Sequence, residues 1–226
     1  MSVLTAVESD RMEMLTHALE PGPGEEAGAA PTIERVQKSV FMMLDPVERT
    51  HAARVGTFAT SVARLLGLDD VTTGAIAVAG ALHDVGKVFV PAAILEKSAP
   101  LTRSEWAAIR RHPSVGAAAL APVIRRLDVL EIVRGHHERW DGAGYPDRRA
   151  GSETPLGARI VAVVDAFAAM TERRCYRRPL KIDEAADELR SHSGTQFDPD
   201  CVLALERLLF GPRAQRARES AQLRAV

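Results

Sequence analysis

The stretch 82–91 holds the residues of this sequence that are best suited to chemistry. His83 stands beside Asp84 at the end of an apolar run, and Gly86 and Lys87 follow. An imidazole and a carboxylate together can hold a divalent cation, and the carboxylate can bridge two. Gly86 would let the backbone turn, so that the Lys87 ammonium points back toward the same place. Taken alone, the dipeptide is more often an ordinary helix-terminal histidine than a metal site.

Further side chains suited to metal binding are distributed along the chain. They are His51, His112, the adjacent pair His136 and His137, and Asp165. Asp165 is a single carboxylate within the apolar run 160–170, where an unpaired charge would be costly. A bound cation would compensate for that charge, and a buried salt bridge to an arginine is the competing interpretation.

The expected helices aim several of these side chains inward. His51 lies one turn before an apolar stripe, which places it at the edge of the core. His112 stands where Pro113 interrupts a helix that begins with the capping box of Thr102 and Glu105. The stripe that follows His51 consists of Val55, Phe58, Val62 and Leu65.

The pair His136 and His137 ends an expected helix over 124–137. Adjacent residues of a helix diverge by about 100°. The two imidazoles could therefore serve two separate ions, or one ion and one substrate oxygen. Each single histidine also fits packing against a neighbour, and only their number favours a metal centre.

A glycine-rich loop follows at 138–146. Gly142 and Gly144 remove side chains from a segment that could approach a ligand closely, and Tyr145 offers a flat face to a base. A plain surface turn is the alternative. Downstream, Arg174 and Arg177 belong to an arginine cluster suited to phosphate or guanine edges, although such clusters are usually solvated faces.

Length and composition favour one all-α domain. The chain has 226 residues, of which 4% are aromatic, and its Ala, Leu, Val and Arg fall in helical patterns. Prolines and glycines at 21–31 indicate a linker. We therefore expect an N-terminal extension with a linker over 1–31, a folded domain over 32–212, and a basic tail over 213–226.

Charge and cysteine content narrow the expected partners. The 29 basic and 30 acidic residues nearly cancel, so no overall field favours DNA, RNA or a membrane. Two isolated cysteines, Cys175 and Cys201, suit a reducing compartment. No signal peptide is visible and no apolar segment reaches the ~20 residues that span a bilayer. The expectation is a cytoplasmic protein.

Taken together, the motifs resemble the HD-GYP family, bacterial phosphodiesterases that degrade cyclic di-GMP and form a subgroup of the HD metal-dependent phosphohydrolases. They follow the family's order over residues 35–210, and six linked motifs are far more specific than one. The residues that carry the resemblance are His51, Leu-His-Asp-Val-Gly-Lys at 82–87, Arg-His-Pro at 111–113, His-His-Glu at 136–138, Asp-Gly-Ala-Gly-Tyr-Pro at 141–146, Val-Val-Asp at 163–165, Arg-Cys-Tyr-Arg at 174–177 and Gly-Thr-Gln-Phe-Asp-Pro at 194–199.

The resemblance implies an HD-type bundle of about seven to eight helices, with the Gly-Tyr-Pro loop beside the active site. It implies two divalent ions, iron or manganese, with Asp84 as the bridge. Lys87, Arg174 and Arg177 would hold the substrate's phosphates, and Gly142, Gly144 and Tyr145 would line the groove. The implied metal ligands are His51, His83, Asp84, His112, His136, His137 and Asp165.

The chain departs from the family's pattern at three positions. Val47 stands where some members have a glutamate that adds a third metal, and Glu48 beside it is expected to point elsewhere, so two metals are expected. Ala168 replaces a second aspartate that the family commonly has, and Cys175 replaces a proline. Ala168 removes a polar side chain that would support the site.

The implied activity is hydrolysis of cyclic di-GMP to linear pGpG, with GMP as an open further product, by way of a metal-bridging hydroxide. Asp84 and Lys87 would be the catalytic residues. The alternatives are an impaired cyclic-dinucleotide sensor or interaction module, and an HD hydrolase of a hybrid cyclic nucleotide. Signalling proteins are the expected protein partners, and the sequence leaves the regulatory input and oligomeric state open.

Overall fold

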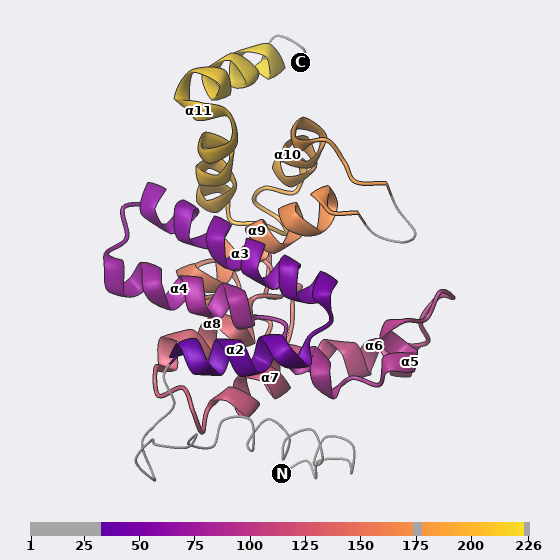
Figure 1. Ribbon diagram of the computed structural model, residues 1–226. Coiled ribbons are helices and arrows are strands. Elements are labelled where there is room, and N and C mark those ends of the chain that lie inside the picture. Colours follow the sequence, from indigo (N-terminus) through magenta and orange to yellow (C-terminus); the bar gives the residue numbers. More distant parts are fainter. Residues whose placement is uncertain (1–32, 174–177, 224–226) are drawn as a thin grey trace.

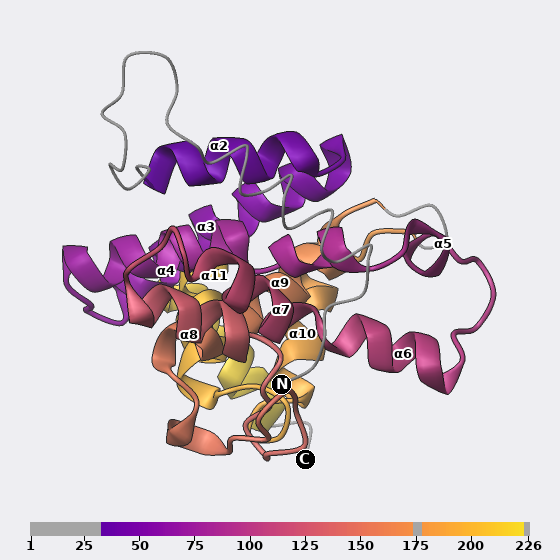
Figure 2. The same ribbon diagram turned by 90° about the horizontal axis from the view of Figure 1, so that it is seen from below.

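The described residues of the protein, 33–173 and 178–223 of a computed structural model, are helical and contain no strand (Figures 1 and 2). The expected all-α fold is therefore confirmed. The α-helices are α2 (Ile33–Met43), α3 (Pro46–Leu65), α4 (Asp70–Leu82), α5 (Ala92–Leu95), α6 (Arg103–Arg110), α7 (His112–Leu120), α8 (Leu127–Gly135), α9 (Leu156–Thr171), α10 (Ile182–Ser191) and α11 (Pro199–Leu223), and the 3₁₀ helices are η1 (Val85–Phe89) and η2 (Gly151–Glu153).

Three parts of the expected organisation lie outside the described residues. These are the N-terminal segment 1–31, the arginines Arg174 and Arg177, and Cys175. Among the helices that the structure does describe, none combines the length and apolar character needed to cross a lipid bilayer. Gly211 interrupts α11 with a φ of 72°, and the helix continues beyond it to Leu223, within the segment expected as a basic tail.

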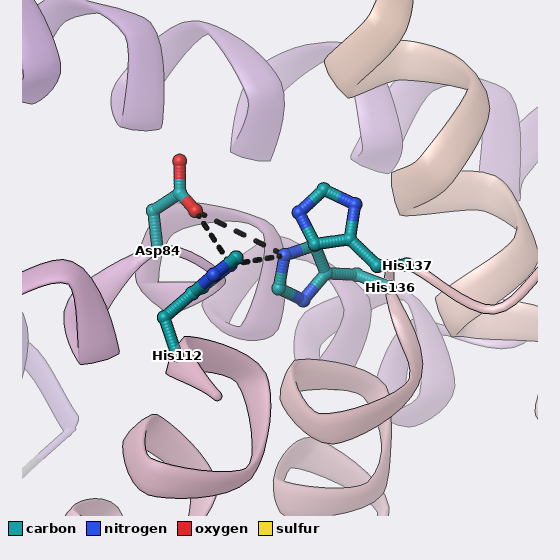
Figure 3. A group of neighbouring side chains, drawn as sticks. All are labelled: Asp84, His112, His136 and His137. Carbon is teal, nitrogen blue, oxygen red and sulfur yellow. Dashed lines mark hydrogen bonds and ion pairs between the residues drawn. The ribbon is translucent and has the colours of Figure 1, made fainter. Parts of the chain in front are cut away.

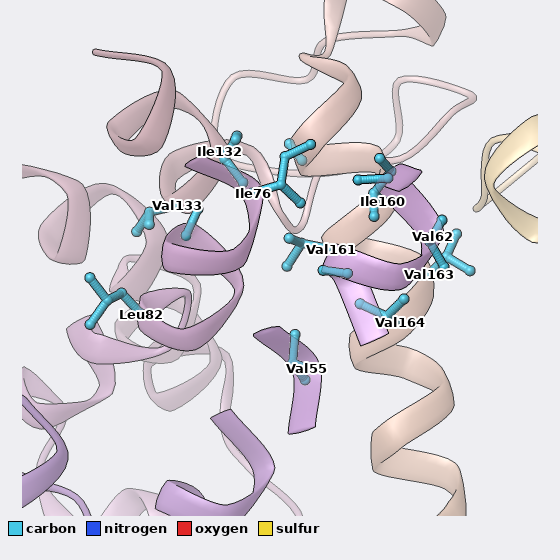
Figure 4. Close-up of a cluster of buried hydrophobic side chains, with 14 of the residues drawn as sticks. Val55, Val62, Ile76, Leu82, Ile132, Val133, Ile160, Val161, Val163 and Val164 are labelled. Carbon is cyan, nitrogen blue, oxygen red and sulfur yellow. The ribbon is translucent and has the colours of Figure 1, made fainter. Parts of the chain in front are cut away.

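The core forms where α3, α4, α8 and α9 pack together (Figure 4). Helix α9 contains the apolar run 160–170, and Ile160, Val161 and Val164 on it are fully buried. A helix that is apolar on most of its circumference belongs in the interior. Because α9 is central, its one carboxylate, Asp165, has to meet other buried groups.

The capping box of Thr102 and Glu105 is present as predicted, with each side chain bonded to the other's backbone N–H. The stripe on α3 differs at its end. Leu65 is 49% exposed, whereas Leu66 packs against the core. Counting four residues from the buried Val62 leads to Leu66, so the inward face follows the i, i+4 spacing there.

Three of the candidate histidines lie at helix ends. His83 follows the last residue of α4, His112 begins α7 directly after α6, and His136 follows the last residue of α8. Helix ends leave backbone groups without intrahelical partners. These positions therefore combine a fixed backbone with carbonyl oxygens that can receive bonds from the side chains.

Gly86 and Gly116 let η1 and α7 touch backbone to backbone. A Cβ at Gly86 would lie 1.9 Å from the carbonyl oxygen of His112, and one at Gly116 would lie 2.9 Å from the Gly86 nitrogen. The backbone at Gly86 does not enter the left-handed region, so close approach, and not a turn, is what requires glycine there. This contact brings Asp84 beside His112.

We expect Gly86→Ala to lower the free energy of unfolding by more than ~2 kcal/mol, because the new methyl group would overlap a backbone carbonyl. Gly74→Ala is the matched control, since a Cβ on this exposed residue of α4 meets nothing within 4 Å. It should stabilise by ~0.5–1 kcal/mol through helix propensity. Urea unfolding of both variants measures the difference, and equal stabilities would contradict the close-approach interpretation.

Candidate metal centre

Four side chains from three segments converge: Asp84, His112, and the adjacent His136 and His137 (Figure 3). One ligand atom from each lies within 4.8 Å of the others. We call them the first group. The second group, His51, His83 and Asp165, satisfies the same distance. All seven side chains that the sequence singled out therefore fall into these two groups, and His136 and His137 fall into the same one.

Asp84 connects the two groups. Its Oδ1 lies 3.1 Å from Nε2 of His112, in the first group, and its Oδ2 lies 3.2 Å from Nε2 of His83, in the second. A carboxylate whose two oxygens face different sets of ligands has the arrangement of a bridge between two cations.

Backbone carbonyls hold three of the imidazoles in one orientation. The Nδ1 atoms of His83, His112 and His136 lie 2.8, 2.7 and 2.7 Å from the carbonyl oxygen three residues earlier in each case. A carbonyl oxygen can only accept, so each Nδ1 carries a proton. In the neutral imidazole Nε2 then has a free lone pair, and this is the outer-shell arrangement typical of histidine metal ligands.

These lone pairs need a positive partner. Nε2 of His112 and Nε2 of His136 lie only 3.2 Å apart. Nε2 of His83 and Oδ1 of Asp84 are buried without a hydrogen-bond partner in the described part of the chain. Buried acceptors without donors are costly. The residues therefore fit a pair of divalent cations, which would satisfy all four atoms at once.

The electrostatics favour the same conclusion. Burial and the neighbouring histidines hold the pKa of His136 well below 6.5, and burial lowers the pKa of His137 to about 4, so both are neutral ligands at neutral pH. Burial also opposes charge on His83, but Asp84 and Asp165 outweigh it and raise its pKa to about 10. The two carboxylates thus favour positive charge where they meet.

Lys87 points back to the centre, as the turn after His83 suggested. Its Nζ lies 2.6 Å from Oδ2 of Asp84 and 3.9 Å from Oε2 of Glu48. Burial opposes the ammonium charge, but Asp84 and Glu48 raise the pKa of Lys87 above its usual range. As expected, Glu48 joins neither group. It lies three residues before His51, hence on a similar face of α3, and its carboxylate approaches Lys87.

The glycine-rich loop is folded back onto the end of α8. Glu138 is buried and its carboxylate accepts the backbone N–H groups of residues 147, 148 and 149 at 2.6, 3.1 and 3.1 Å. A Cβ at Gly144 would lie 2.4 Å from the Arg139 nitrogen, so the two backbones are in direct contact. The sequence suggested no role for Glu138, although an acidic residue directly after two histidines was a signal.

Tyr145 lies beside the first group. Its ring centroid is 4.9 Å from that of His137. The Arg110 guanidinium also contacts the Tyr145 ring, at 5.5 Å from its centroid. Burial, together with the charge of Asp84, raises the pKa of Tyr145 to about 12, so the phenol stays protonated at neutral pH. Gly142 has a φ of 76°, which favours glycine. The sequence did not single out Arg110.

Comparison with known proteins places this centre in a family. The profile of the family described as HD domain matches residues 35–201. The chain belongs to the HD-domain family. The two groups of His and Asp side chains are consistent with the binuclear metal site of HD domains. The motifs place this HD domain in the HD-GYP branch, in agreement with the relatives that it matches.

Two curated relatives of this HD domain are similar in sequence. One is a 3′3′-cGAMP-specific phosphodiesterase 2 of Vibrio cholerae, 38% identical over 154 residues, which cover 67% of this chain and 30% of the relative. The other is a cyclic di-GMP phosphodiesterase of Thermotoga maritima, 38% identical over 162 residues, which cover 70% of this chain and 44% of the relative. The chain thus spans less than half the length of these relatives.

A solved structure agrees on the fold. It is described as an HDG"Y"P protein from Bdellovibrio bacteriovorus, has a TM-score of 0.61 and 16% sequence identity, and the match covers 90% of this chain and 70% of that one. At this identity the likeness concerns the fold alone. It confirms the expected HD-type helical bundle.

We expect metal-free protein to bind two Mn²⁺ or Fe²⁺ ions and to unfold at a higher temperature when they are added. An ion at 100 times its Kd stabilises by ~2.7 kcal/mol. Asp84→Ala should lose most of this gain, because it removes both facing oxygens. Asp70→Ala, at the exposed start of α4, is the control. Two ions bound tightly by the Asp84 variant would contradict the bridging role.

Proposed function

We propose that this chain is a metal-dependent phosphodiesterase that hydrolyses cyclic di-GMP to linear pGpG. The observation that supports it is the position of Asp84, whose two oxygens face the two groups of histidines. A related cyclic di-GMP phosphodiesterase of Thermotoga maritima supports the substrate class. Whether the linear product is cleaved onward to GMP is a separate question for the assay.

The proposed ligands are the seven side chains of the two groups, with Asp84 as the bridge. Imidazoles and carboxylates without a thiolate suit iron or manganese. Two such ions supply activation of a water molecule and neutralisation of phosphate charge. The chain's own contribution is to hold the imidazole Nε2 atoms toward Asp84 while the carbonyl contacts at Nδ1 prevent the rings from turning.

Lys87 is proposed as the residue that stabilises charge on the non-bridging phosphate oxygens. Its Nζ already lies 2.6 Å from Asp84 and its side chain is 27% exposed, so it stands between the buried carboxylate and solvent. A phosphate held next to Asp84 would come within reach of the same ammonium group. The remaining proposed phosphate contacts, Arg174 and Arg177, lie outside the described residues.

Tyr145 is proposed to bind the substrate beside the first group. It is half-buried against His137, with Arg110 near its ring. Gly144 lets the loop backbone contact the backbone at Glu138 and Arg139, and Gly142 approaches Arg148 and Ala150. A neutral phenol with one ring face against an imidazole can stack or hydrogen-bond with a nucleotide without adding negative charge near the phosphates.

A second substrate, 3′3′-cGAMP, is favoured by the relative from Vibrio cholerae. Both dinucleotides contain guanine and a 3′,5′-phosphodiester, so the proposed centre treats their phosphates alike. They differ in one base. The choice between them therefore depends on contacts to the bases and not on the metal ligands.

We expect manganese-loaded protein to convert cyclic di-GMP to pGpG, at a rate at least ~100-fold above that of Asp84→Ala. The assay follows both dinucleotides by chromatography and compares kcat/KM. A higher kcat/KM for 3′3′-cGAMP would make it the preferred substrate and overturn the cyclic di-GMP assignment. Binding of either dinucleotide without turnover would indicate a sensor and overturn the enzyme proposal.

We expect Arg177→Ala to raise KM by ~10-fold with a smaller change in kcat, because it would remove a phosphate contact that substrate and transition state share. Arg125→Ala, an exposed arginine before α8, is the matched control and should leave KM unchanged. An unchanged KM in the Arg177 variant would remove this residue from the substrate site.

A further inference from the structure

Glu172, the residue after α9, contacts the second group. Its Oε2 lies 2.8 Å from Nδ1 of His51, while Nε2 of the same ring lies 2.9 Å from Oδ1 of Asp165. A carboxylate can only accept, so Nδ1 of His51 donates to Glu172 and Nε2 donates to Asp165. A cation beside Asp165 would take the place of the Nε2 proton while Glu172 keeps the proton on Nδ1, so Nε2 is the atom that His51 can offer to the ion.

Arg54 holds the Glu172 carboxylate from its other side. Its Nη1 lies 3.3 Å from Oε1 of Glu172, and its Nη2 donates to Oγ1 of Thr171 at 2.9 Å. The guanidinium also lies over the rings of Phe58 and Phe167, at 5.5 and 6.0 Å. The carboxylate is therefore fixed between a positioned cation and the imidazole.

His51 needs such a partner more than the other histidines do. His83, His112 and His136 lie at helix ends and donate from Nδ1 to backbone carbonyls three residues earlier. His51 lies inside α3, where the carbonyls serve the helix itself. Its Nδ1 requires an acceptor from another element, and Glu172, 121 positions away in sequence, provides it.

Glu172 also bears on the departure at Ala168. Ala168 is fully buried in α9 and brings no polar atom to the site. Glu172 comes four residues later, directly after the last helical residue, and its N–H donates to the carbonyl oxygen of Ala168. Its carboxylate, 2.8 Å from Nδ1 of His51, brings a polar group to the site from that position.

We propose that Glu172 is a positioning residue of the second metal site, where it orients His51 so that Nε2 faces a divalent cation shared with His83 and Asp165. This rests on the proposed metal centre but not on the identity of the substrate. Second-shell carboxylates of this kind change metal affinity by ~10–100-fold when removed. Glu172 makes no contact with substrate in this proposal.

The test is a Mn²⁺ titration of metal-free protein, followed by electron paramagnetic resonance without nucleotide. Glu172→Ala should raise the Kd of one of the two ions by ~10–100-fold and leave the Kd of the other within about threefold of its native value. Glu172→Gln should recover much of the loss, because its amide oxygen still accepts from Nδ1 of His51. Glu131→Ala, exposed on α8, is the control and should bind both ions normally.

Native Kd values for both ions in Glu172→Ala would overturn the proposal. An equal rise in the Kd of both ions, in Glu172→Ala and in Glu172→Gln alike, would also overturn it, because that result would indicate a general distortion of the metal centre. Failure of the activity proposal is separable. Native protein that binds two ions yet cleaves neither dinucleotide would reject the phosphodiesterase and leave the role of Glu172 standing.

Discussion

The buried carboxylate of Asp84 is the feature on which the rest of the centre depends. Its oxygens face Nε2 of His112 and Nε2 of His83 at 3.1 and 3.2 Å, and Lys87 lies 2.6 Å from one of them. A buried carboxylate is tolerated only when charges and hydrogen bonds compensate for lost hydration. In their neutral form the surrounding imidazoles offer lone pairs to these oxygens and not donors, since carbonyl oxygens hold their Nδ1 protons. The arrangement is consistent with a pair of divalent cations, which would compensate for the charge.

Helix ends both place and orient the histidines of this fold. They place His83, His112 and His136 at the centre of the bundle, and they leave carbonyl oxygens free to orient those same rings. The contact between Gly86 and Gly116 then fixes the distance between two of these ends. Packing of the backbone and geometry of the ligands are therefore coupled, and a methyl group at this contact would disturb both.

A second layer of carboxylates surrounds the ligands. Glu138 accepts three backbone N–H groups directly after the loop that carries Tyr145, while Glu172 orients His51 with the help of Arg54. Neither has a proposed ligand role, and Glu172 determines which nitrogen of His51 is available to an ion. Neither was assigned a role from the sequence: the place of Glu138 after two histidines was a local signal, whereas Glu172 meets a histidine 121 positions away and leaves no local pattern.

Local patterns determined much of this protein in advance. The apolar run within α9, the capping box at Thr102 and the set of seven candidate ligands follow from periodicity, caps and residue types, which act over a few neighbouring positions. Tertiary structure alone decided that the two oxygens of Asp84 face separate groups, that Glu48 approaches Lys87, and that Glu172 contacts His51. These contacts join residues up to 121 positions apart, and the packing of whole helices sets them.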